Sequence, residues 1–109
     1  MDEIENLTIE YQKANNRLQA LALQKAQLSA EKEEYKKALE EVEKTQGKVY
    51  TTKGNILIEV SKEESIKAIK DEQDSIDLKL SIIEKQYSET EKRNKELLEK
   101  INSLIKKDQ

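Results

Sequence analysis

The residues of this chain that could carry out chemistry are carboxylates, which stand in adjacent pairs of Glu at positions 33–34, 40–41 and 63–64. Paired carboxylates can hold a cation or act as a general acid and a general base. Both uses need further groups, and the chain has no His and no Cys. This excludes imidazole bases, thiol nucleophiles, disulfides and nearly all zinc or copper sites. We interpret the pairs as solvated helix carboxylates and expect no enzymatic activity, no metal site and no cofactor.

Charge and patterning also argue against nucleic acid and membranes. The 20 basic and 23 acidic residues give a net charge of −3 and are interleaved, whereas nucleic-acid binding normally requires a basic face or block. Acids often precede a lysine by four residues, as at Glu33 with Lys37, which suits an exposed helix side. No signal-peptide pattern and no run of about 18 apolar residues is present. We expect a cytoplasmic protein that binds neither nucleic acid nor membrane.

The composition favours long helices over a compact globule. Of the 109 residues, 39% are charged and only 35% are hydrophobic, with no Pro, Phe or Trp. A compact globule needs more apolar side chains to offset conformational entropy, whereas a helix pair needs only one apolar stripe on each helix. We therefore expect an all-α dominated fold that forms a single domain over residues 1–109.

A heptad-type apolar seam runs through both halves of the chain, with positions separated alternately by three and four residues. The seam residues are Ile4, Leu7, Tyr11, Ala14, Leu18, Leu21, Lys25, Leu28, Lys32, Tyr35, Leu39, Val42, Ile66, Ile69, Gln73, Ile76, Leu80, Ile83, Tyr87, Thr90, Asn94, Leu97, Ile101 and Leu104. The halves mirror each other about one centre, so that Val42 corresponds to Ile66 and Ile4 to Leu104. This symmetry predicts a long antiparallel two-helix coiled coil, with helices over residues 4–44 and 62–106.

Five seam positions are polar, namely Lys25, Lys32, Gln73, Thr90 and Asn94. They could form a polar site inside the coil, or they could fix the register, because a polar seam residue penalises wrong alignments. Each lysine could lay its methylenes on the seam and extend its ammonium into water. We interpret these positions as register control. The Thr90 and Asn94 layers are weakly packed, and we hypothesise that they let the helix ends separate.

Between the helices the pattern changes to the two-residue period of strands. Residues 48–52 and 55–60 are rich in β-branched side chains, and Gly54, which can take a positive φ, lies at the turn between them. This predicts a β-hairpin over residues 48–60. Gly47 is expected to end the first helix in a left-handed conformation. Ser61 and Glu64 form a capping-box pattern for the second helix.

A single two-stranded hairpin is marginal in water and leaves unpaired edges. A slim helix pair offers little surface to cover it, so we expect several chains to combine their hairpins into a shared sheet or barrel. The residues expected to form this oligomer contact, called the hairpin residues below, are Val49, Tyr50, Ile56, Leu57, Ile58 and Val60.

The ends of the helices away from the hairpin carry more apolar residues than a seam requires. Ile9, Leu98 and Ile105 widen the apolar stripe there, which indicates a contact site. Scattered surface aliphatics are also normal, and Leu23, Leu78 and Ile82 lie off the seam elsewhere, so the pattern alone leaves both explanations open. The candidate contact residues, called the tip residues below, are Ile4, Leu7, Ile9, Tyr11, Leu97, Leu98, Ile101, Leu104 and Ile105.

The region around the turn resembles the hairpin of the β-class subunits of prefoldin. The similarity lies in Val49-Tyr50, Gly54-Asn55-Ile56-Leu57-Ile58, Val60 and the charged Lys62-Glu63-Glu64. Gln24-Lys25 through Leu28 and Ala38-Leu39-Glu40-Glu41 are similar to the family's first helix. A single hairpin indicates the β class rather than the α class. The resemblance covers essentially the whole chain, which departs from the family in ending at residues 106–109 without an extended tail.

This resemblance implies an ATP-independent molecular chaperone, a holdase, of archaeal or eukaryotic cytosol. In the family, four β-class and two α-class subunits join their hairpins into a β-barrel. The distal coiled-coil tips of that hexamer hold unfolded polypeptides and pass them to a group II chaperonin. The implied partners are therefore an α-class prefoldin subunit, unfolded client proteins and a group II chaperonin. The alternative is a structural coiled-coil spacer or scaffold that is oligomerised through its β-hairpin.

Overall fold

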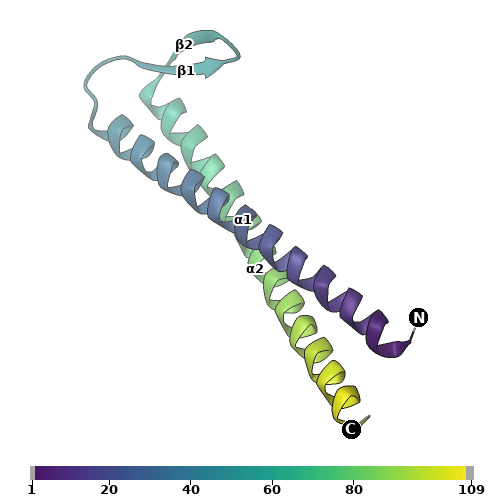
Figure 1. Cartoon of the computed structure of the whole chain (residues 1–109). Coiled ribbons are helices and arrows are strands. Elements are labelled where there is room, and N and C mark those ends of the chain that lie inside the picture. The colour runs from purple at the N-terminus through teal and green to yellow at the C-terminus, as the bar shows by residue number, and fades with distance from the viewer. Residues whose placement is uncertain (1, 108–109) are drawn as a thin grey trace. The chain divides into compact units, whose positions relative to one another are not determined.

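The computed structural model describes residues 2–107, which form two long helices and two short strands (Figure 1). Helix α1 spans Glu3–Lys44, strand β1 spans Val49–Lys53, strand β2 spans Ile56–Val60 and helix α2 spans Lys62–Lys107. The predicted fold class, two long helices with one antiparallel hairpin between them, is confirmed. Helix α1 begins one residue earlier than the expected 4–44 and ends where expected, and α2 begins where expected and ends one residue later than the expected 62–106.

The chain divides into two compact units. Unit 1 consists of Met1–Ala26 and Ser81–Gln109, and unit 2 consists of Gln27–Leu80. Unit 2 therefore contains the hairpin, and unit 1 contains every tip residue. That residues 1–109 act as one domain stays a prediction.

In unit 1 the segments of α1 and α2 run antiparallel. Glu10 pairs with Arg93 at 2.9 Å and Lys25 with Glu84 at 3.7 Å, so rising numbers on α1 meet falling numbers on α2. The buried core of this unit consists of Ala14, Leu21, Leu97 and Ile101, all of which are seam residues. In unit 2 the buried seam residue is Ile76, and Lys32 pairs with Asp77 at 2.7 Å.

The heptad seam itself is confirmed by burial. Every seam residue is buried or half-buried except Lys25 and Lys32. Their side chains are 50% and 52% exposed, and each ammonium group pairs with a carboxylate of α2. This arrangement lets a lysine occupy a seam position, because its charge lies at the solvated margin of the helix pair.

The start of each helix has a polar cap. The backbone N–H of Glu5 donates to Asp2 Oδ1 at 2.8 Å, and the N–H of Glu64 donates to Ser61 Oγ at 3.0 Å. Both bonds satisfy N–H groups that have no partner inside their helix. The cap predicted at Ser61 is therefore present, and Asp2 supplies one that the sequence analysis did not identify.

The end of α1 differs from the expectation. Gly54, with φ of 62°, is the one described residue with positive φ, so the left-handed cap expected at Gly47 is wrong. The last turn is closed instead by Thr45 N–H, which donates to Glu41 O at 3.0 Å. Two further carbonyl oxygens accept hydrogen bonds from the Lys62 ammonium, Glu43 O at 2.7 Å and Thr45 O at 3.4 Å. A glycine cap is unnecessary because a distant lysine satisfies these carbonyls.

The hairpin turn follows the expectation. Gly54 takes a positive φ and Asn55 does not, which is the pattern of a type II′ two-residue turn. This turn matches the right-handed twist of its strands and fixes the register, in which Lys53 lies opposite Ile56 and Val49 opposite Val60.

Candidate functional site

The hairpin carries exposed apolar side chains on both of its faces. Successive side chains along a strand point to opposite faces of the sheet, and residues directly opposite each other on β1 and β2 share a face. Ile56, Ile58 and Val60 therefore lie on one face. Leu57 and Tyr50 lie on the other. The exposed fractions are 53% for Tyr50, 65% for Ile56, 68% for Leu57 and 41% for Ile58. Val49 and Val60, at the base of the hairpin, are half-buried. Within residues 2–107 the sheet has two strands, so each has one unpaired edge.

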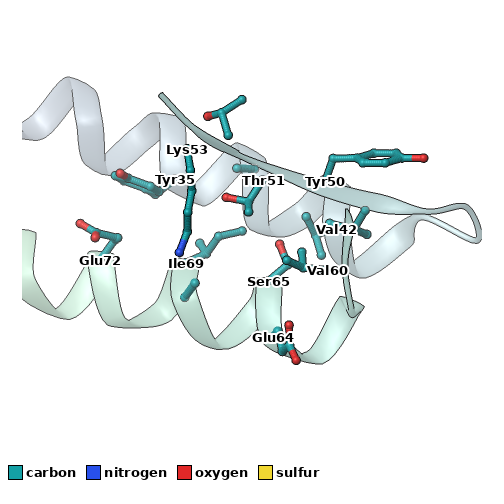
Figure 2. A pocket seen from close by; sticks show the side chains of 14 residues that line it. Tyr35, Val42, Tyr50, Thr51, Lys53, Val60, Glu64, Ser65, Ile69 and Glu72 are labelled. Carbon is teal, nitrogen blue, oxygen red and sulfur yellow. The ribbon is translucent and has the colours of Figure 1, made fainter. Parts of the chain in front are cut away.

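A cavity of about 750 Å³ separates the hairpin from the helices of unit 2 (Figure 2). Its helical wall includes Tyr35, Val42 and Ile69, which are half-buried seam residues. Figure 2 shows Lys53 reaching from the strand toward the helices, while Tyr50 points away from the cavity. The hairpin of the single chain is therefore not packed tightly onto its own helices, and its apolar side chains beyond the base remain exposed among the described residues.

The tip residues fall into three groups of different burial. Leu97 and Ile101 belong to the core, with exposed fractions of 1% and 8%. Four others, Ile4, Leu7, Tyr11 and Leu104, are half-buried seam residues. The exposed ones are Ile9 at 39%, Leu98 at 40% and Ile105 at 43%. A ligand can reach the exposed group directly, whereas it can reach Leu97 and Ile101 only if the helices separate.

The exposed tip residues do not form one stripe. Leu98 and Ile105 are seven residues apart on α2, so they lie on the same side of that helix. Ile9 follows the seam residue Leu7 by two positions and therefore points away from the seam of α1. The structure thus brings two of the three together, and the third faces a different direction.

A polar contact crosses the helix pair of unit 1 close to these residues. The Asn94 amide Nδ2 donates to Asn15 Oδ1 at 2.8 Å and to Tyr11 O at 3.5 Å, while Thr90 Oγ1 donates within α2 to Gln86 O at 2.7 Å. The bonds of Asn94 support its interpretation as register control, because another alignment would separate the two amides. Sequence reasoning missed Asn15, although a half-buried seam Asn requires a polar partner.

The residues first considered for chemistry have no partner groups for it. The six paired glutamates are all exposed on α1 and α2. Among residues 2–107, no group of three or more carboxylates is arranged to hold a metal ion. Neither of the two described helices is long and apolar enough to cross a membrane. The apolar hairpin and the exposed tip residues therefore remain the candidate functional surfaces.

Comparisons with known proteins find the same architecture. The family described as "Prefoldin subunit" matches residues 5–108. Prefoldin subunit beta of Methanosarcina acetivorans is 37% identical over 105 residues, which cover 94% of this chain and 90% of the relative. The corresponding subunit of Methanosarcina barkeri is 35% identical over the same shares. The crystal structure of the prefoldin beta subunit from Thermococcus strain KS-1 superposes with a TM-score of 0.88 at 24% identity, covering 95% of this chain and 93% of that chain.

Fold and surfaces together define a helix–hairpin–helix coiled-coil subunit whose hairpin, within residues 2–107, exposes apolar side chains beyond its base. The family match spans nearly all of the sequence, and the chain belongs to the prefoldin subunit family. The relatives named above are beta subunits, which confirms the predicted β class. Prefoldin subunits are chaperones, and a chaperone function as a prefoldin subunit follows for this chain.

Proposed function

We propose that this chain is the β-class subunit of a cytoplasmic, ATP-independent holdase and not an enzyme. It joins an α-class subunit through its hairpin, in a hexamer of two α-class and four β-class chains. The assembly binds unfolded polypeptides through the tip residues and passes them to a group II chaperonin. The carrying observation is that Ile9, Leu98 and Ile105 are 39–43% exposed, which gives unfolded chains an accessible apolar surface.

The energetics suit a holdase. Burying the exposed part of an aliphatic side chain contributes about 1 kcal/mol or less at about 25 cal/mol per Å² of apolar area. One subunit therefore binds a client weakly, but several subunits around one client raise the effective concentration, so that the combined affinity exceeds each contact. Apolar contacts are not directional, and the surface can accept clients that share no sequence motif.

The exposed hairpin residues support the assembly step. Tyr50, Ile56, Leu57 and Ile58 are each more than 40% exposed, and each strand has an edge that no other described strand pairs with. An isolated sheet of this kind is an aggregation hazard unless another chain pairs with it. Other subunits that add strands to these edges would remove the hazard, which supports an oligomer built through the hairpin.

The test compares two triple variants with equal numbers of exposed aliphatics replaced by Ser. The first changes the exposed tip residues Ile9, Leu98 and Ile105. The control changes Leu23, Leu78 and Ile82, which are 61%, 64% and 49% exposed. Ile101 is left intact because it is 8% exposed and belongs to the core. Each variant is co-expressed with an α-class subunit, its mass is measured natively, and suppression of the aggregation of a denatured client is assayed without ATP.

We expect the tip variant to retain the wild-type mass and to lose most of its suppression, while the control keeps both. Equal activity of the two variants would refute the tip as the client-binding surface. Full activity of both variants would favour the spacer or scaffold function. The exposed aliphatics of the tip would then be ordinary surface residues, as Leu23, Leu78 and Ile82 are elsewhere on the helices.

A further inference from the structure

The base of the hairpin contains a long-range contact that family membership does not assign. The Lys62 ammonium donates hydrogen bonds to the backbone oxygens of Glu43 at 2.7 Å and Thr45 at 3.4 Å. Both oxygens lie at the C-terminal end of α1, whereas Lys62 is the first residue of α2. The contact therefore closes residues 45–61, which comprise the hairpin and its two connections, into one loop.

Lys62 stands at an unfavourable position for its own helix. The N-terminus of a helix carries a partial positive charge, which favours acids such as Glu63 and Glu64 and disfavours a lysine. The C-terminus of α1 carries the opposite partial charge, and its last carbonyls need donors because Gly47 forms no left-handed cap. The charge of Lys62 therefore complements the end of α1 rather than the start of α2.

The two connections of the hairpin differ in length. Ser61 alone separates β2 from α2, whereas residues 45–48 separate α1 from β1. The position of β2 is therefore set closely by α2, because a one-residue connection leaves few conformations open, whereas the longer connection leaves the end of α1 free to vary relative to the hairpin. Among the described residues, the end of α1 and the start of α2 are joined by polar contacts through the bonds of Lys62.

We propose that Lys62 is a positioning residue for assembly, because it ties the end of α1 to the start of α2 and so fixes the direction in which the hairpin leaves the helices. The inference rests on the proposed assembly through the hairpin and deepens it. A sheet edge accepts a partner strand only at a set position and angle. A loosened hairpin base would have to be ordered on association, which weakens binding.

The test replaces Lys62 in the full chain by Met and by Glu, with Lys67→Met as the matched control. Lys67 is an exposed lysine slightly further along α2. Lys62→Met keeps the aliphatic stem and removes the donors. Lys62→Glu places an acid where the start of α2 favours one and where the end of α1 disfavours one. If residue 62 acted only on α2, Lys62→Glu would leave assembly unchanged or strengthen it. If residue 62 acts by holding the end of α1, Lys62→Glu weakens assembly. The assembly constant with an α-class subunit is measured by native mass titration, and amide hydrogen exchange and far-UV circular dichroism are measured on the subunit alone.

We expect Lys62→Met to weaken assembly on the order of fivefold, since it removes an exposed charge-assisted bond. Lys62→Glu weakens assembly further, Lys67→Met leaves it unchanged, and all variants keep the helical spectrum. Faster exchange at residues 45–48 is expected in both Lys62 variants. Assembly of Lys62→Glu equal to or tighter than wild type would overturn the proposal, as would unchanged exchange at 45–48. If the wild type itself does not assemble, the proposed function fails, and the exchange data still decide whether Lys62 holds the hairpin base.

Discussion

Leu97 and Leu98 allow stability and client binding to be separated with two adjacent residues of the same type. Leu97 is 1% exposed and Leu98 is 40% exposed on the same helix. Leu97→Ala removes a buried methine and two methyl groups, worth about 0.8 kcal/mol each, and leaves a void in the core of unit 1, so we expect a loss of about 3 kcal/mol. Leu98→Ala leaves no enclosed void, and we expect a loss of about 0.5–1 kcal/mol.

The assay is urea unfolding of the subunit, followed by circular dichroism at the helical band. The expected result is a lower midpoint for Leu97→Ala at an unchanged denaturant slope, with a much smaller shift for Leu98→Ala. Equal losses within about 0.5 kcal/mol would refute the reasoning, because the two side chains would then be equally buried in solution.

The same pair tests whether the helices of unit 1 separate when they hold a client. At a temperature where both variants are folded, we expect Leu98→Ala to weaken suppression of client aggregation and Leu97→Ala to leave it nearly unchanged. If Leu97→Ala weakens it equally, clients reach the core, and the hypothesis of separating helix ends is favoured over binding to the static surface.

Three further predictions concern the turn, the polar layer and an ion pair. Gly54→Ala should destabilise the chain by about 1 kcal/mol, because the φ of Gly54 is 62°, whereas Gly47→Ala should be nearly neutral. Thermal unfolding measures both effects, and equal destabilisation by the two variants would contradict the turn assignment. Asn94→Ala should lose about 1 kcal/mol and speed amide exchange in unit 1, and unchanged exchange would show that its bonds do not hold the helices. A double-mutant cycle on Lys32 and Asp77 should give a coupling energy of about 0.5 kcal/mol or less, because both side chains are 52% exposed, and this coupling should fall further at high salt. A coupling energy above about 1 kcal/mol would indicate a less solvated pair.

Much of the fold followed from periodicity and turn chemistry. The seam was predictable because a helix pair buries one stripe, so the spacing of apolar residues directly reports the buried side. The type II′ turn was predictable in part, since Gly54 stands between two β-rich segments and tolerates a positive φ. The cap at Ser61 is also local, because a hydroxyl and an N–H three residues later satisfy each other without any tertiary contact.

Where the prediction was wrong, a distant residue replaced the local rule. Gly47 fits the sequence pattern of a left-handed helix end, yet the end of α1 is completed by Lys62 across the hairpin. The partner of Asn94 was missed for a related reason, since Asn15 lies off the seam. Periodicity identifies which residues face the other helix, but it does not give the hydrogen bonds that long side chains make at the margins.

The amino-acid sequence alone determines that two helices form, which side of each is apolar and where the chain turns, because these depend on the spacing of residues within a segment. Only the tertiary structure decides that Leu97 and Ile101 are core while the other seam positions of the tip are half-buried, that Lys25 and Lys32 pair with acids of α2, and that Lys62 completes α1. The physical reason is that exposure and pairing depend on atoms far away in the sequence, which come into contact only after the helices pack together.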